Sequence, residues 1–458
     1  MDNWVINFEA KLGEEEISKV VKDWDKRAIY RVSICAKELN PKAYLPHSVS
    51  FGPYHCDEIE LKLQMDVHKR RALHYFLKKS RKSLTTYVNA LQAVLPDLIA
   101  NYDSLNMSYW QEDNKFLQLM LLDGCFMLEI LRANVEIKQR GDIYGEYGDA
   151  DPIFSYHGKV YVMPYIKRDM LMLQNQLPML LLRKLITVEA APPAGEEDQV
   201  RYLNKMILNF VNPNYTIPSN QLQVDSLHVL DLYRKSLLGL GRSQPQKAPE
   251  TIFKGIPNIV GSACFCIKKK EGPIDIVRSA MKLHESGVDF KTNDSTSIMD
   301  ICFHGGELKL PVIFVDDTTE SALLNLMAFE RAHVGAGNEV TSYVSFMDNI
   351  IDSAKDVSLL HSSGILHNNI GSEKAVANLF NGISKDVTPD PEGSLEKVHK
   401  ELDDFCNTKC NEWRANLKRT YFKSPWAFVS LLAAVFLILL TTAQTFYAVL
   451  SYHHPSKS

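Results

Sequence analysis

The 458-residue sequence lacks any excess of cationic side chains, because 51 Lys and Arg face 55 Asp and Glu, a formal net charge of −4. It therefore lacks the basic footprint of a nucleic-acid-binding protein, and no nucleic-acid partner is predicted. Cysteine is scarce, with eight residues, which excludes a disulfide-dense small scaffold. A hydrophobic content of 45% and a charged content of 23% exclude global disorder.

Catalytic signatures are absent too. The sequence contains no P-loop, no dinucleotide fingerprint, no G-x-S-x-G elbow, no H-E-x-x-H and no kinase motif set. Two close cysteine pairs, Cys264–Cys266 and Cys406–Cys410, are poor candidates for a four-ligand zinc site, because the first is too tightly spaced and the second borders an apolar segment. We therefore predict no catalytic, cofactor-binding or metal-binding residues, and a protein that is not an enzyme.

One long apolar run stands near the C-terminus. Residues 426–450 carry no charged side chain, and as a helix they would extend about 37 Å, enough to cross a hydrocarbon core about 30 Å thick. Trp426 lies at one end of the run, and Tyr447 and Tyr452 lie near the other, as aromatic residues do at membrane interfaces. The alternative is a buried core helix, but such helices seldom reach this length without a charge. We predict a single-pass membrane protein.

Cations on the two sides of this run predict its orientation. Only Lys457 follows it, whereas five cations precede it: Lys409, Arg414, Lys418, Arg419 and Lys423. The positive-inside tendency therefore predicts a tail-anchored protein with the bulk of its chain in the cytosol, in a plasma membrane or endomembrane. The triplets at Asn106, Asn214 and Asn293 would become glycosylation acceptors if the orientation were reversed.

Gln444 is a polar residue inside the apolar run. Its amide could hydrogen-bond to a second helix and favour a homo-oligomer, or it could simply lie near the membrane interface.

Apolar periodicity predicts a mainly α, helix-rich domain. Residues 59–79, 83–101, 114–132 and 342–357 are predicted to be helices, the second broken at Pro96. The third is apolar nearly all round, which predicts a central position in the core. Residues 297–315 predict one small β-hairpin around Gly305–Gly306, with Pro311 forcing its strand to an edge or a bulge.

Composition shifts along the chain predict its domain organisation. We predict an N-terminal extension (1–25), a helix-rich domain (26–394) with a possible subdomain boundary near 239–275, a juxtamembrane helix or stalk (395–425), a transmembrane helix (426–450) and a short tail (451–458).

Three polar residues lie within apolar segments predicted to be buried: Asp123, Asp169 and His228. A buried ionisable group must be paired, hydrogen-bonded or neutral. Each is therefore either a tuned acid or base of an unrecognised active site, or a structural group bound to a neighbour. The structural interpretation is favoured.

Several strings, taken together and in order, are similar to a known plant family. They include IYRVSICAKELNPKAYLPHSVSFGPYH (29–55), FLQLMLLDGCFMLEILR (116–132), DMLMLQNQLPMLLL (169–182) and ICFHGGELKLPVIFVDDTTE (301–320). The sequence resembles the plant "domain of unknown function 247" family, also called uncharacterised protein family 0481, over about residues 26–450. The resemblance implies a plant membrane protein with a helix-rich domain and one C-terminal span. It also implies a possible role in self-incompatibility, because some grass members are implicated as pollen-side determinants.

These observations favour a membrane-anchored recognition or signalling protein with a protein or peptide partner. Two alternatives stay open. One is a membrane-tethered enzyme using Asp123, Asp169 or His228, and the other is a structural tether or scaffold.

Overall fold

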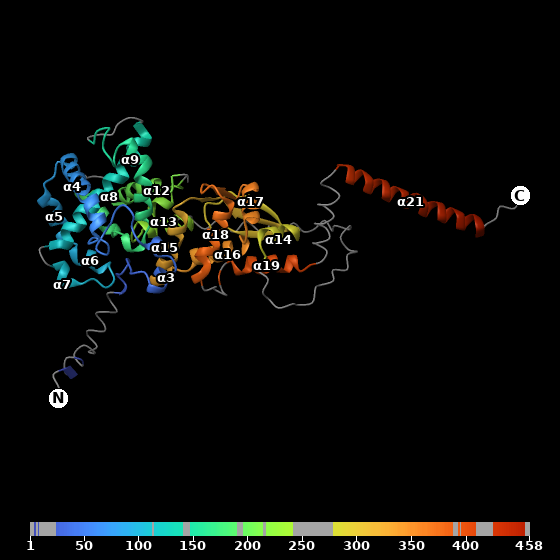
Figure 1. Ribbon diagram of the computed structural model, residues 1–458, viewed down its shortest axis with the longest axis horizontal. Helices are drawn as coiled ribbons and strands as arrows, with labels where there is room; N and C mark the ends of the chain where they lie inside the picture. The colour runs from blue at the N-terminus through green and yellow to red at the C-terminus, as the bar shows by residue number, and fades with distance from the viewer. Residues whose placement is uncertain are drawn as a thin grey trace.

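The computed structural model describes residues 4–5, 8, 24–111, 114–140, 147–189, 196–213, 217–240, 278–387, 393, 395–408 and 425–453. The predicted mainly α fold is confirmed (Figure 1). Between residues 24 and 240 the elements, with η for 3-10 turns, are α3 (Ile34–Leu39), η1 (Pro41–Tyr44), α4 (Ile59–Ser80), α5 (Leu84–Gln92), α6 (Leu95–Ala100), α7 (Met107–Gln111), α8 (Lys115–Arg140), α9 (Tyr156–Tyr161), α10 (Met163–Met170), η3 (Leu173–Asn175), α11 (Met179–Glu189), α12 (Glu196–Val211), η4 (Gln221–Gln223) and α13 (Val229–Leu237).

The part of the fold after residue 278 mixes helices with short strands. Its elements are α14 (Ala280–Glu285), β1 (Asp289–Asn293), β2 (Cys302–His304), β3 (Glu307–Pro311), β4 (Ile313–Val315), α15 (Thr319–Ala332), α16 (Glu339–Ile350), α17 (Ala354–Ser362), β5 (Leu366–Asn368), α18 (Glu373–Ile383), η5 (Ser384–Asp386), α19 (Glu396–Cys406) and α21 (Pro425–His453).

Helix α8 is central to the first part, as its all-round apolar sequence predicts. Phe126, Leu128 and Ile130 are fully buried, and the helix packs against α4, α5, α11 and α12. Pro96 lies in the first turn of α6, so the predicted break between α5 and α6 is also confirmed.

The prediction of one continuous helix over 342–357 is wrong. Helix α16 ends at Ile350, and α17 begins after a capping box in which Ser353 and Asp356 bind each other's backbone N–H groups. These local hydrogen bonds satisfy the orphan N–H groups of a new helix start, so they compete with continuation of the first helix. The apolar spacing hides the break, because Ile350 and Val357 are both fully buried on either side of it.

The predicted hairpin is confirmed, with β2 and β3 antiparallel around Gly305 and Gly306. The sequence did not predict that β1 pairs in parallel with the other edge of β3, nor that β4 pairs in parallel with β5. Of the edge or bulge expected at Pro311, the edge is therefore wrong, since β3 is the central strand. Pro311 is its last residue, where a missing N–H donor interrupts little of the ladder.

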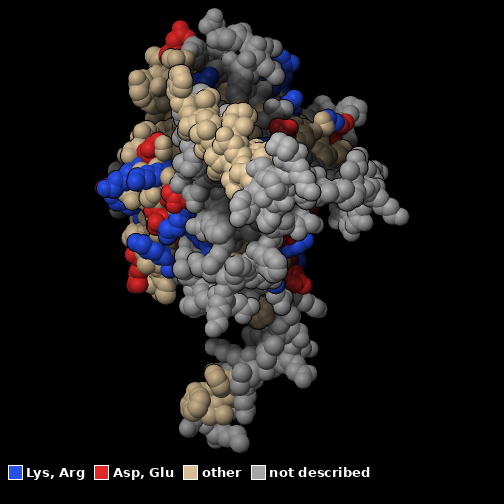
Figure 2. Space-filling view, turned by 90° about the vertical axis from the view of Figure 1, so that its right-hand side faces the viewer, with Lys and Arg blue, Asp and Glu red and all other residues tan. Residues whose placement is uncertain are grey.

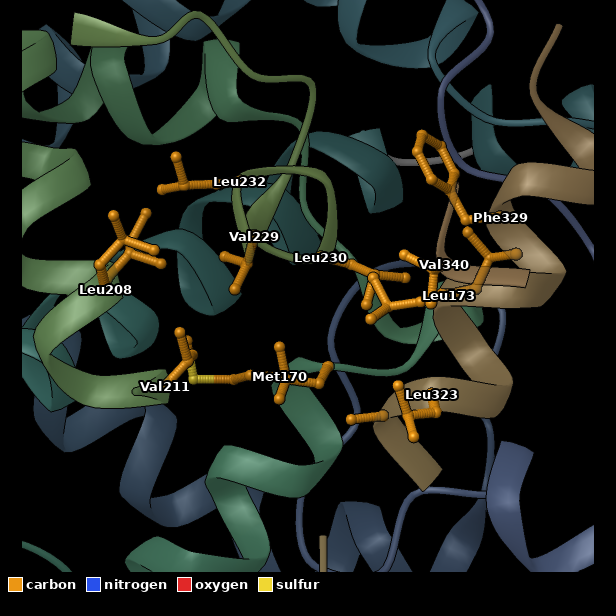
Figure 3. Close-up of a cluster of buried hydrophobic side chains, with 14 of the residues drawn as sticks. Met170, Leu173, Leu208, Val211, Val229, Leu230, Leu232, Leu323, Phe329 and Val340 are labelled. Carbon is orange, nitrogen blue, oxygen red and sulfur yellow. The ribbon is translucent and has the colours of Figure 1, made fainter. Parts of the chain in front are cut away.

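A single apolar cluster joins the two parts of the fold (Figure 3). Its labelled members include Leu230 of α13, Leu173 of η3, Phe329 of α15 and Val340 of α16. All four side chains are fully buried. Burying each of these side chains stabilises the fold by roughly 1.5–3 kcal/mol. Helix α15 is therefore held in place by the core rather than by its own helix propensity.

Residues 28–43, which include α3, lie against α15 and are called the strap. Ser321 Oγ and Asn325 Nδ2 of α15 both donate to the backbone carbonyl of Ala43, each at 2.9 Å. Asn325 Oδ1 also accepts the backbone N–H of Leu173 at 2.9 Å. Residues nearly 300 positions apart in the sequence therefore lie side by side, and α3 lies next to α15.

The predicted domain boundaries stay predictions. Residues 241–277 cover most of the proposed subdomain boundary and lie outside the described residues, as does most of the predicted stalk beyond Thr408.

Candidate functional site

Asp169 anchors the loop that follows η1. Its fully buried carboxylate accepts the backbone N–H groups of His47, Ser48 and Val49, at 3.0, 2.7 and 2.9 Å. Burial raises the pKa of Asp169 to about 6, and the three backbone hydrogen bonds act in the opposite direction. With its oxygens committed to the backbone, Asp169 holds the loop and is not presented to a ligand.

Asp123 holds the next residues of the same loop through an internal ion pair. The Lys69 ammonium donates to Asp123 Oδ1 at 2.6 Å and to the Ser50 carbonyl at 2.6 Å. Gly52 N–H donates to Asp123 Oδ2 at 2.8 Å. Burial raises the pKa of Asp123, while the Lys69 ammonium opposes that rise. In the structure Asp123 therefore forms an internal ion pair with Lys69.

His228 is the N-cap of α13. Its Nδ1 accepts the backbone N–H of Asp231 at 3.2 Å, and its Nε2 lies 3.1 Å from the Ala28 carbonyl. Only the neutral tautomer with its proton on Nε2 makes both bonds. Burial accordingly lowers the pKa of His228 to about 4.

The three predicted candidates are therefore not brought together as one site. Within the described residues, Asp123 and Asp169 bind different positions of the loop 47–52, and His228 binds the strap at Ala28. In that same part of the chain, no three His, Cys, Asp or Glu side chains gather in a way that could hold a metal ion.

The His228 geometry predicts a pH dependence of stability. Its folded pKa of about 4 lies below the ordinary 6.5, so at pH between these values the unfolded chain binds a proton that the folded chain excludes. The stabilisation is complete above about pH 6.5 and is lost as pH falls through about 4, to a total of roughly 3 kcal/mol.

Denaturation of the wild type and His228→Asn at several pH values measures this loss. Asn keeps an N-cap acceptor but does not titrate. The difference between the two proteins should shrink as pH falls from 6.5 to 4, and a constant difference would contradict the assignment.

Glu330 of α15 links three helices. It accepts Nε of Arg234 from α13 at 2.8 Å, and it accepts the backbone N–H groups of Val340 and Thr341, at 2.9 Å each, in the first turn of α16. The N-cap residue of α16, Asn338, makes no side-chain cap bond, so Glu330 supplies that function from another helix.

An open groove of about 410 Å³ lies between α3, α15 and the end of α18 with η5. Its floor is apolar, formed by Val32, Ala36, Leu324, Met327, Ala328 and Ile383. On α15 the lining residues Leu324, Ala328 and Arg331 follow one helix face at i, i+4 and i+7. The volume falls within the 300–1,000 Å³ typical of ligand pockets.

Three cations lie on the rim of the groove: Arg31, Arg331 and Lys385. The Arg31 guanidinium is positioned over the Tyr54 ring, 4.5 Å from its centroid. At the other end of α15, Glu320 Oε1 accepts Asn40 Nδ2 at 2.6 Å. Sequence reasoning missed this groove. The α15 stripe is readable from helical periodicity, but the facing residues of α3 and η5 are brought to it only by the strap and by packing.

Helix α21 is long and apolar enough to cross a membrane. Its window Leu432–Val449 is not buried against the rest of the protein, and in Figure 2, seen from the side of α21, it shows no charged side chains. Trp426 is 83% exposed at its start, and Gln444 lies within it. The predicted juxtamembrane cations Arg414, Lys418, Arg419 and Lys423 lie outside the described residues.

Comparison with known proteins shows which family the chain belongs to. A family model described as a plant protein of unknown function, domain of unknown function 247, matches residues 29–440. The chain belongs to this family. The family match begins in the strap before α3 and ends inside α21, so it contains the clamped loop, Glu330 and the groove.

Two Arabidopsis thaliana relatives, both named as members of uncharacterised protein family 0481, are similar along most of their length. One is 30% identical, covering 94% of this chain and 87% of the relative. The other, named as putative, is 24% identical, covering 98% of this chain and 95% of the relative. No solved structure matches the chain.

The sequence strings that carry the family resemblance contain the side chains that hold the loop 47–52 and the loop itself. DMLMLQNQLPMLLL contains Asp169 and also Asn175, which accepts Phe51 N–H at 2.7 Å and donates to the Val49 carbonyl at 3.0 Å. HSVSFGP contains the backbone that they hold. In this family member these residues therefore hold the loop 47–52 in place.

The cysteines divide by position. Cys406 is buried at the end of α19, whereas Cys264, Cys266 and Cys410 lie outside the described residues. Cys302, which follows an apolar run, is exposed at the start of β2.

Proposed function

We propose that this family member is a membrane-anchored recognition protein that acts through protein–protein interaction. The observation that carries the proposal is the unburied apolar surface of α21 beside a globular domain that encloses its own core. Exposing an apolar helix of this size to water costs tens of calories per mole for each Å² of apolar surface. The helix therefore needs a membrane or a partner to cover it.

Recognition is favoured over catalysis by how the polar residues are used. Asp123, Asp169 and His228 each bind backbone groups that the fold would otherwise leave unsatisfied. The open groove, in contrast, presents apolar and cationic side chains at the surface. A signalling role, and the link to self-incompatibility that the family resemblance implies, stay predictions.

Deleting residues 426–450 tests the anchor. We expect the full-length protein to sediment with alkali-washed plant membranes and the deleted protein to remain in the supernatant, because the apolar window lies in the deleted segment. A deleted protein that still resists alkaline washing would contradict the anchor. Crosslinking in intact cells then tests recognition: a recurrent protein partner of the full-length chain is expected, and its absence would contradict the proposal.

The structure also helps to choose a glycosylation triplet that reports the orientation of the chain in the membrane. The side-chain nitrogen of Asn293 donates to the Asp300 carbonyl at 2.7 Å, so this triplet is engaged in the fold. Asn106 is exposed immediately before α7 and is the better internal reporter. We expect Asn106 to remain unmodified and an acceptor added to the C-terminal tail to be glycosylated. Modification of Asn106 would place the domain on the opposite side.

A further inference from the structure

We propose that the groove between α3, α15 and η5 binds an extended segment of a partner protein that carries two apolar side chains with carboxylates beside them. The inference rests on the proposed recognition function and names the chemistry of the partner. The apolar side chains would cover the groove floor, and the carboxylates would face Arg31 and Arg331.

The length of the groove along α15 fits a short extended segment. Its lining along α15 runs from Glu320 to Arg331, eleven residues apart, which is about 16 Å along a helix. About five residues in extended conformation, at roughly 3.3 Å each, fill the same length.

The charges of the groove favour a segment that carries carboxylates. Arg331 lies in the last turn of α15, and Arg31 follows Tyr30, whose hydroxyl lies 2.9 Å from His333 Nδ1 just beyond that helix. Arg331 therefore marks one end of the groove, and the Arg31 guanidinium, positioned over the Tyr54 ring, adds a second positive charge to its lining. Glu320, held by Asn40, lies at the other end. Carboxylates are attracted to the first end, and Glu320 repels them from the second.

The open side of the groove favours a protein segment over a small molecule. Leu39 is 58% exposed although it lines the groove, and Gly382 is exposed on the opposite wall. Small-molecule sites bury about 70–90% of the ligand surface, which an open-sided groove cannot do. A chain that continues beyond both ends can cover Leu39 with its neighbouring residues.

Gly382 provides a way to close the groove without disturbing the core. It lies in α18, and a Cβ built on it meets no atom within 4 Å. Gly382→Trp therefore places an indole in open space, and replacing a helical glycine carries no helix-propensity penalty of its own.

The test uses the full-length protein in lipid nanodiscs and three fluorescein-labelled heptapeptides, SLSLSDE, SLSLSKR and SSSSSDE. We expect the first to bind at least about tenfold more tightly than the other two, since only it offers both apolar anchors and carboxylates. Gly382→Trp should abolish this preference. Lys385→Glu on the rim should weaken binding of SLSLSDE at least about fivefold, whereas Lys374→Glu, an exposed residue of α18 that does not line the groove, should leave it unchanged.

Unfolding curves for the variants separate loss of binding from loss of folding. Equal binding of the three peptides, or binding of SLSLSDE that Gly382→Trp leaves intact, overturns the groove proposal. If the crosslinked cellular partner is captured equally by the wild type and Gly382→Trp, recognition stands and the groove is not its site. If no partner is captured from cells, the proposed function fails whatever the peptides do.

Discussion

Asp123→Ala is expected to lower the free energy of unfolding by about 3–5 kcal/mol, because it leaves the buried Lys69 ammonium without its carboxylate. Both side chains are almost inaccessible, and the Asp123 carboxylate also holds Gly52 N–H. The loop 47–52 has no ladder of its own and relies on side chains from other elements, so we expect it to loosen first. Denaturant unfolding of the full-length protein in detergent, followed by fluorescence of the buried Trp110, measures the change.

A surface ion pair on α4 supplies the control. Arg70 and Asp66 lie 3.5 Å apart with exposed side chains, so Asp66→Ala should change stability by no more than about 1 kcal/mol. The double variant Lys69→Met with Asp123→Leu should recover part of the loss, because it removes both buried charges. Similar losses for Asp66→Ala and Asp123→Ala would contradict the buried pair.

The second large effect is expected for Glu330→Ala, again about 3–5 kcal/mol, since it leaves the Arg234 guanidinium buried and removes the acceptor from the first turn of α16. Arg234 keeps one other carboxylate, Glu339, at 2.5 Å. Glu339 is 43% exposed, so Glu339→Ala should cost no more than about 1 kcal/mol. Hydrogen exchange should show faster opening of the start of α16 in Glu330→Ala.

The alternative outcome is informative. If Glu330→Ala and Glu339→Ala destabilise equally, Arg234 is held by whichever carboxylate remains, and α16 begins without help from α15. If only Glu330→Ala is strongly destabilising, the Glu330 carboxylate connects α15, which forms one wall of the groove, to α16.

The fold connects these effects to the proposed recognition surface. The strap is fixed at Ala28 by His228 and at Ala43 by Ser321 and Asn325, and these contacts set where α3 stands beside α15. The groove is the space left between them. Destabilising the strap should therefore alter the groove, whereas Gly382→Trp alters the groove alone.

Local sequence determined the elements whose causes are local. The all-round apolar pattern of 114–132 produced the central helix α8, Pro96 separated α5 from α6, and Gly305–Gly306 turned the β2–β3 hairpin. The uncharged run 426–450 likewise produced the exposed apolar helix α21. In each case the physical cause lies within a few residues, as hydrophobic periodicity, a missing N–H donor or a turn that needs positive φ.

Only the tertiary structure decided what the polar residues do. The sequence identified Asp123, Asp169 and His228 as buried groups needing partners, but their partners Lys69, Val49 and Ala28 are 54 to 200 positions away. The groove depends in the same way on α3, α15 and η5, which meet only because the core and the strap hold them together. Short-range patterns fix where helices form, but pairing across the chain depends on which arrangement satisfies all buried polar groups at once.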